Sequence, residues 1–206
     1  TTGAKLIKLI VNNHSATYSS VKNLTEFNKL TTLLKDELLG DFTMYGEASE
    51  TLGLTNSITI EVKRFISRVA VNSIKTSFSG TPYEGEELSD CKLYLVNVHG
   101  EKIVNNNGNP TSAVILNNGQ LVDSDASSTA TEDLIMGSIS ATIGSTAMTT
   151  PHYFYAYSNL TDDQENCTKL VLECTLKGNR YYYPIPINQA GYGLTTGGTA
   201  GVDRNT

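Results

Sequence analysis

The chain has 206 residues, a formal net charge of −6, and a composition that is 39% hydrophobic and 17% charged. This length suits one large domain or two small ones. No run of Lys or Arg forms a basic stripe, which argues against a nucleic-acid partner, and no apolar run approaches the roughly 18–20 residues that span a bilayer. Thr, Ser, Asn, Gly and Tyr are abundant, which is typical of exposed antiparallel β-structure and of exported proteins.

The N-terminal part predicts a strand followed by a helix. Leu6–Val11 is an apolar run of strand length. From residue 21 to residue 39 apolar side chains recur at spacings of three and four, Ser19 and Ser20 can cap the start, and Gly40 can end the helix. We therefore expect an amphipathic helix near residues 21–39, packed on a sheet.

The stretch SITIEVKRFISRVAV (57–71) predicts a strand that changes face. It begins with strict alternation, is interrupted by Arg64 and Arg68, and resumes on the other parity with Val69 and Val71. Such a change is typical of a bulge or bend where a chain leaves one sheet for another.

The rest of the chain reads as β-structure. Strand patterns occupy 91–98, 152–159, 168–176 and 180–187, and Lys177-Gly178-Asn179 predicts a tight turn between the last two. Successive strands without intervening helices favour a sandwich over a parallel sheet.

Two prolines mark the last of these strands as unusual. Pro184 and Pro186 lack backbone N–H groups at alternate positions, so both missing donors face the same side of the strand. The neighbouring residues Tyr183, Ile185 and Ile187 keep their N–H groups. The segment is therefore predicted to pair on one side only.

The sequence contains no recognisable catalytic constellation. His14, His99 and His152 lie far apart, and none has a nucleophile or carboxylate whose position can be argued. No GxSxG, HExxH, GxGxxG or P-loop pattern is present. We expect no enzyme, no cofactor and no metal.

The three cysteines, Cys91, Cys167 and Cys174, are an odd number and lack zinc-ligand spacing. We interpret Cys91 and Cys174 as buried small hydrophobic residues. A disulfide between two of the three stays open if the protein is exported, and the sequence does not say which pair would form it.

Two weaker binding patterns also stay open. Asp123, Asp125 and Ser127 have the alternate spacing that begins a calcium loop, without the central Gly and final Glu of an EF-hand. The tyrosines of HYFYAYSN and RYYYPIPIN could line a sugar-binding surface, although such residues are more often cross-strand pairs within a sheet.

Several of these segments, taken in order, resemble the fimbrillin family of Bacteroides-type bacteria, whose members are the stalk, tip and anchor subunits of surface (type V) pili. The matching segments are VKRFISRVAV, TPHYFYAYSN, TKLVLECTLKGNRYYYPIPIN and the terminal DRNT. The residues that carry the match are Arg64, Arg68, Tyr153, Tyr155, Asn159, Tyr181, Tyr183, Pro184 and Pro186. Ser67-Arg68 stands where Ala-Lys is commoner, and the family's first strands and last strand are absent.

The resemblance implies two consecutive transthyretin-like β-sandwich domains in a mainly β chain with one short helix in the N-terminal part. Residues 1–57 would be the remainder of the first domain, and residues 58–206 the second domain without its last strand. It also implies export to the outer membrane and cell surface as a lipoprotein whose only membrane contact is a lipid anchor on the precursor. Proteolytic removal of an N-terminal strand would then precede assembly.

The function implied is a non-enzymatic pilus subunit that joins other subunits, in a homo- or hetero-polymer, by donor-strand exchange and mediates adhesion to host or bacterial surface ligands. The alternative is a cell-surface glycan-binding β-sandwich lipoprotein that uses the tyrosines. For Arg64 and Arg68 we expect a structural role, in which their guanidinium groups bond to carbonyls and carboxylates of the neighbouring sandwich.

Overall fold

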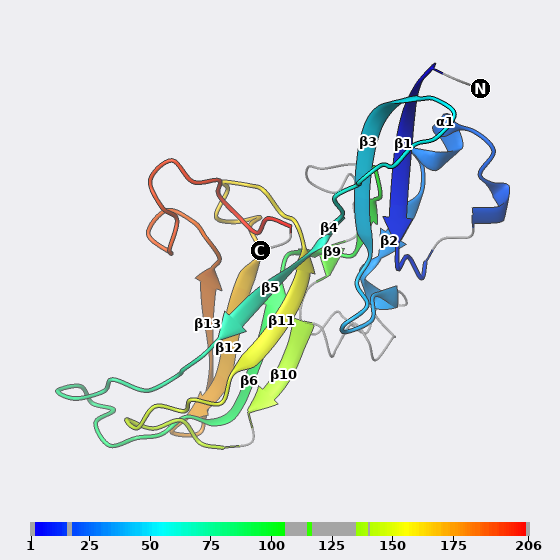
Figure 1. Ribbon diagram of the computed structural model, residues 1–206. Helices are drawn as coiled ribbons and strands as arrows, with labels where there is room; N and C mark the ends of the chain where they lie inside the picture. The colour runs from blue at the N-terminus through cyan, green and yellow to red at the C-terminus, as the bar shows by residue number, and fades with distance from the viewer. Residues whose placement is uncertain (1–2, 16–17, 106–114, 117–134, 140, 205–206) are drawn as a thin grey trace.

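The computed structural model describes residues 3–15, 18–105, 115–116, 135–139 and 141–204. Within this described part the chain forms thirteen strands and a single α-helix of one turn (Figure 1). All strand pairs in the named sheets are antiparallel. The predicted fold class, mainly β with one short helix, is confirmed.

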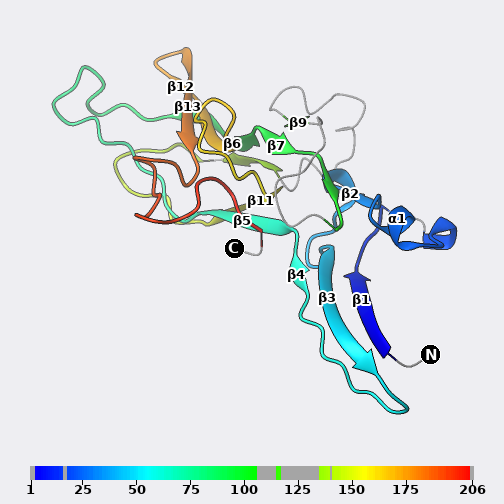
Figure 2. The same ribbon diagram turned by 90° about the horizontal axis from the view of Figure 1, so that it is seen from above.

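The N-terminal sheet is built on one long ladder. Strand β1 (Gly3–Val11) pairs along its length with β3 (Met44–Leu52), and β4 (Lys63–Arg64) joins the other edge of β3 (Figure 2). Strand β1 contains the predicted apolar run, so that prediction is confirmed. On the other edge of β3, pairing with β4 begins only at Lys63. The strand that we expected to begin at residue 57 is therefore shorter than predicted.

A close backbone approach accompanies that shorter strand. A Cβ atom at Gly46, in the middle of β3, would lie 2.1 Å from the carbonyl oxygen of Glu61. No side chain fits at that distance, so glycine is required where the chain before β4 crosses β3.

The helix predicted over residues 21–39 is wrong in its extent. Helix α1 (Leu24–Phe27) is one turn long, capped by Asn23, whose side chain accepts a bond from the Glu26 N–H. The 3-10 turns η1 (Tyr18–Ser20) and η2 (Leu34–Asp36) flank it at a distance.

The second half of that stretch is a strand because a distant partner competes for its backbone. Strand β2 (Thr31–Leu33) pairs with β8 (Glu101–Ile103), and the N–H of Leu34 donates to the carbonyl of Gly100 at 2.9 Å. The pair Thr31-Thr32 is β-branched and weak in helices. The three- and four-residue periodicity is a local pattern and could not indicate that β2 pairs with a strand about seventy residues away.

The larger C-terminal part has two layers. One layer is a four-stranded sheet in the order β10-β6-β12-β13, formed by β10 (Met136–Ile139), β6 (Ser89–Val96), β12 (Lys169–Leu176) and β13 (Asn179–Pro186). Lys177 and Gly178 close the β12–β13 hairpin with φ values of 50° and 79°. Positive φ at both turn residues is typical of a two-residue hairpin loop, and the predicted turn is confirmed.

The second layer is the two-stranded sheet of β5 (Ile66–Val71) and β11 (His152–Tyr157). Both views show it lying across the four-stranded sheet (Figures 1 and 2). The short pair β7 (Val98–His99) and β9 (Ile115–Leu116) continues beyond β6. Buried side chains between the layers include Cys91, Leu93, Leu95, Phe154, Ala156 and Cys174.

The chain changes sheet at Phe65. Strand β4 pairs with β3, the N–H of Phe65 donates to the carbonyl of Thr43 at 3.1 Å, and β5 then pairs with β11. Phe65 itself is fully buried. The change of face that we predicted between Val62 and Val69 is the point where the chain leaves one sheet for the other. The domain boundary near residue 57 stays a prediction. Strand β2, before this boundary, pairs with β8, which lies after it.

Candidate functional site

Strand β13 is the edge of the four-stranded sheet and pairs only with β12 among the described residues. The N–H of Ile187, just after the strand, donates to the carbonyl of Thr168 at 3.1 Å. Because N–H directions alternate along a strand, Tyr183 and Ile185 also turn their N–H groups toward β12. The backbone nitrogens of Pro184 and Pro186 therefore face the unpaired edge of the sheet, as the sequence predicted.

The face of β12 and β13 that turns toward the second layer is only partly covered. Tyr183 and Ile185 lie opposite Leu172 and Leu170, which pack against the core. Yet Tyr183 is 42% exposed and Ile185 45% exposed. We call this surface the open inner face, and its residues are Leu170, Leu172, Tyr181, Tyr183, Ile185 and Ile187.

The cause of this exposure is the unequal width of the two layers. Within the described part of the chain, β5 has a hydrogen-bonded neighbour on one side only, strand β11. Its other edge and the open inner face meet at a cavity of about 260 Å³. The cavity is lined by Ser67, Arg68, Val69, Ile187, Asn188, Gly201, Val202 and Asp203. An unpaired edge beside an apolar face is the combination that accepts an added strand.

The C-terminal segment closes one end of this site. Asn159 and Val202 exchange backbone hydrogen bonds of 2.8 and 3.1 Å. The Ser67 hydroxyl donates to the carbonyl of Asp203. Gly201 has a φ of +86°, and a Cβ there would lie 2.0 Å from the carbonyl oxygen of Asn159. The glycine is thus required for the segment to approach the end of β11.

Asn159 connects three segments through its buried amide. Its Nδ2 donates to the carbonyls of Asn97 and Asn166, at 3.2 and 3.0 Å, and to the Thr168 hydroxyl at 3.3 Å. Asn159 is 4% exposed. This residue of the predicted signature therefore holds the start of β12 and the end of β6 against the end of β11.

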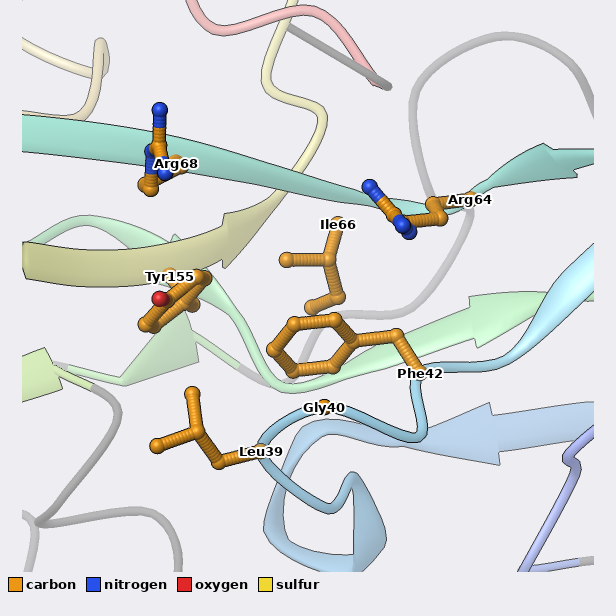
Figure 3. A pocket seen from close by; sticks show the side chains of 7 residues that line it. All are labelled: Leu39, Gly40, Phe42, Arg64, Ile66, Arg68 and Tyr155. Carbon is orange, nitrogen blue, oxygen red and sulfur yellow. The ribbon is translucent and has the colours of Figure 1, made fainter.

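The two predicted arginines lie at a second cavity, of about 510 Å³, on the outer side of β4 and β5. Figure 3 shows its lining: Leu39, Gly40, Phe42, Arg64, Ile66, Arg68 and Tyr155. Within the described residues the guanidinium groups of Arg64 and Arg68 form no hydrogen bond or ion pair. The polar contacts that we expected them to make across the junction are therefore not present there. Arg68 instead lies over the Tyr153 ring, 5.2 Å from its centroid.

The tyrosines of the signature are not brought together on one surface. Tyr153 and Tyr155 have the same parity on β11, and Tyr155 packs on Phe42 with ring centroids 5.1 Å apart. Tyr181 and Tyr183 stack on the open inner face of the other layer, with centroids 6.4 Å apart. The two pairs thus belong to different layers of the sandwich.

Comparison with known proteins places this architecture. No protein-family model and no curated protein sequence matches the chain. Among solved structures, two "putative cell adhesion proteins" from Parabacteroides distasonis match with TM-scores of 0.74 and 0.58, at 19% and 14% identity. A fimbrilin (fimA) from Porphyromonas gingivalis matches with a TM-score of 0.54 at 15% identity.

The fold is that of the fimbrillin-type proteins. The matches cover 100%, 99% and 91% of this chain, and 65%, 74% and 65% of those structures. This chain therefore spans about two thirds of the length of the first of them. The resemblance predicted from the sequence is confirmed at the level of the fold.

A buried polar cluster inside the fimbrillin-type fold was missed from the sequence. The Glu37 carboxylate, 1% exposed, accepts bonds from the Thr43 N–H at 2.8 Å, the Thr32 hydroxyl at 3.0 Å and the Tyr157 hydroxyl at 2.7 Å. Burial, and then the charge of Glu37, raise the pKa of Tyr157 well above its ordinary value. Glu37 follows Lys35 and Asp36 in the sequence, so it has the pattern of an exposed charged run and gave no signal of its burial.

A buried lysine was also missed. Lys102 on β8 has no exposed surface, its Nζ donates to the Ser158 hydroxyl at 3.3 Å, and it lies 5.5 Å from the centroid of the Phe65 ring. Burial, assisted by the charge of Arg204, lowers the pKa of Lys102 to about 8. Its sequence neighbours alternate as in any half-buried strand and do not distinguish it.

The cysteines follow the sequence interpretation. Cys91, Cys167 and Cys174 are all buried and free, and Cys91 and Cys174 belong to the apolar core. Burial, and then the nearby Cys174, raise the pKa of the Cys91 thiol to about 11. None has the lowered thiol pKa of a reactive cysteine.

No metal-ligand cluster was found in the part of the chain that the structure describes. The calcium-like residues Asp123, Asp125 and Ser127 lie outside the described residues. The described helices include none that is long and apolar enough to cross a membrane.

Proposed function

We propose that this chain is a non-enzymatic subunit of a bacterial surface pilus and that it receives a strand from a neighbouring subunit. The single observation that carries this proposal is the open inner face beside the edge of β5 that no described strand pairs with. A fimbrillin-type fold, shared with structures described as fimbrilin and cell adhesion proteins, supports it.

The incoming strand would pair with β5, because β13 is chemically unsuited to that role. On the open side of β13 the prolines at 184 and 186 provide no N–H, and an added strand would lose two ladder bonds. The open edge of β5 (Ile66–Val71) carries no proline. A strand paired there would lie over Tyr183 and Ile185.

The energy available is sufficient for a slowly dissociating complex. Covering this face with four or five aliphatic side chains contributes roughly 1.5–3 kcal/mol for each, or on the order of 10 kcal/mol in total. Ordering of the incoming segment offsets part of this gain.

The biological setting follows from the same proposal. The chain would be exported as a lipoprotein precursor to the outer membrane, processed by proteolysis and polymerised with other pilus subunits. Its two regions would be consecutive transthyretin-like sandwiches divided near residue 57. Adhesion to host or bacterial surfaces would be a property of the assembled fimbrium.

The test uses short peptides that tile the complete gene product, added to the purified chain in thermal unfolding experiments. A peptide present at a hundred times its Kd raises the free energy of unfolding of the chain by about 2.7 kcal/mol. For a chain of this size, this corresponds to a rise in melting temperature of roughly 5–10 °C. We expect one peptide to produce this rise with the wild type. Ile185→Asp should abolish the rise, whereas Tyr182→Asp, on the opposite face of β13, should retain it.

The opposite results identify the rival function. If no peptide raises the melting temperature, or if Ile185→Asp and Tyr182→Asp respond alike, donor-strand exchange at this face is excluded. Stabilisation by oligosaccharides, lost on substitution of Tyr153 or Tyr155, would instead support the glycan-binding alternative.

A further inference from the structure

The cavity in Figure 3 has a charge pattern that the proposed strand exchange does not use. Arg64 and Arg68 lie at its two ends, on strands that run directly into each other, with the side chain of Ile66 between them. The Arg64 side chain is turned toward Ile66 and Phe42. Phe42, Leu39 and Gly40 come from the loop that precedes β3 and form the opposite wall.

Neither guanidinium is neutralised within the described part of the chain. The ion pairs found there join Lys8 to Glu47, Lys177 to Glu86 and Arg180 to Glu173. Asp41, the acidic residue next to the lining, has its Oδ2 3.2 Å from Nε2 of His14. In the described ranges these two exposed arginines have no carboxylate partner, although the net charge of the protein is −6.

Among the described residues, the lining offers hydrogen-bond donors and apolar surface, and its side chains include no carboxylate or carboxamide. A neutral sugar presents hydroxyl donors that need such acceptors when water is excluded. A carboxylate needs only donors, and the planar guanidinium matches it with two parallel bonds. Phe42 and Tyr155 would then pack against the apolar body that carries the acid.

The spacing of the two arginines favours an extended ligand. Arg64 and Arg68 are four residues apart with the change of sheet at Phe65 between them, so their Cα atoms are at most about 13 Å apart, and both side chains line the same cavity. An extended peptide spans about 13 Å over four residues, so acidic residues at its positions i and i+4 match Arg64 and Arg68. An apolar residue at i+2 would then contact Ile66.

We propose that this cavity binds an extended acidic segment of a partner protein, with the pattern acidic–x–apolar–x–acidic. Arg64 and Arg68 bind the two carboxylates, and Ile66, Phe42 and Tyr155 receive the apolar side chain. Arg68 lines both this cavity and the one at the open edge of β5, whereas Arg64 and Phe42 line this cavity alone and distinguish the two sites.

The probe is a fluorescein-labelled peptide with the core Glu-Thr-Leu-Thr-Glu, and binding to the full chain is measured by fluorescence anisotropy. We expect saturable binding that weakens as salt is raised. A peptide with Gln in place of both Glu should bind at least about tenfold more weakly, since it loses both charge-assisted pairs. A peptide with the acids only two residues apart should also bind more weakly, because it reaches only one arginine.

The matched variants are Arg64→Ala and Lys63→Ala, which remove one exposed positive charge each from adjacent positions of β4. Arg64→Ala should lower the affinity for the peptide by about tenfold. Lys63→Ala should change the affinity by less than about twofold, as expected of non-specific attraction alone. Circular dichroism checks that both variants fold.

Equal effects of the two substitutions, or equal binding of the Glu and Gln peptides, would overturn the proposal. So would tighter Arg64-dependent binding of a sialylated or uronic-acid oligosaccharide than of the peptide. The thermal assay with Ile185→Asp is independent of Arg64, so failure here is distinguishable from failure of the strand-exchange function.

Discussion

The Tyr157 hydroxyl donates a 2.7 Å hydrogen bond to Oε1 of Glu37. The two residues are 120 positions apart, and both are almost completely buried. This bond joins the turn after β2 to strand β11. It therefore ties the region before the predicted boundary at residue 57 to the region after it.

We expect Tyr157→Phe to destabilise the protein by about 1–3 kcal/mol, because a buried carboxylate loses one of its donors. Urea denaturation followed by far-UV circular dichroism measures the change. Tyr153→Phe, at a tyrosine that is 46% exposed, is the control and should be within about 0.5 kcal/mol of wild type. Equal stability of Tyr157→Phe and wild type would show that the bond is dispensable.

Asn159→Asp tests the buried amide at the end of β11. The new carboxylate has no N–H to donate to the Asn97 and Asn166 carbonyls, and a buried negative charge would face them. We expect a loss of about 3 kcal/mol or more at pH 7, with part of it recovered at pH 4 as the carboxyl is protonated. The exposed Asn179→Asp is the control, and the prediction is wrong if both variants unfold at the same urea concentration.

Lys102 predicts a specific dependence of stability on pH. Its pKa is lowered to about 8 by burial from an ordinary value of 10.5, so between these pH values the unfolded chain holds a proton that the folded chain does not. Stability must then rise with pH across this window. The penalty of burying the cation is fully present below pH 8 and is relieved above it, by up to about 3 kcal/mol.

The measurement compares urea denaturation of wild type and Lys102→Met at pH 7 and pH 10. The variant should be favoured at pH 7, and its advantage should shrink by about 2–3 kcal/mol at pH 10. Lys92→Met, at an exposed position on β6, should show no such change. Parallel curves for Lys102→Met and wild type would mean that the lysine is charged throughout this range.

The parts of the fold that could be read from the sequence are those set by local rules. Strands β11, β12 and β13 follow from alternation and are confirmed, as is the Lys177-Gly178 turn that joins the last two; the pairing of β11 with β5 was not predicted. The change of sheet at Phe65 was visible as a change of parity. The longer helix failed because the pairing of β2 with β8 is set by contacts far along the chain.

The same distinction separates the site residues. The edge character of β13 follows from Pro184 and Pro186 themselves, and was predictable. The open inner face depends on how many strands lie opposite it, and the sequence of a single segment does not indicate that number. Lys102 and Glu37 gain their surroundings from Ser158 and Tyr157, 56 and 120 residues away. Their burial therefore had no local sequence signal.

We also predict that the prolines of β13 prevent this edge from pairing with the edge strand of a second copy. The open side of β13 is a hydrogen-bonding edge next to exposed tyrosines, with Tyr182 57% exposed. Restoring the two missing N–H groups by Pro184→Val with Pro186→Val should make this edge competent to pair with a second copy. We expect concentration-dependent dimers or aggregates of the double variant in size-exclusion chromatography with light scattering, and Pro82→Ala, in an exposed loop, should behave as wild type. If the double variant elutes as wild type does at every concentration, the prolines do not protect this edge, and a strand added at β13 becomes as reasonable as one added at β5.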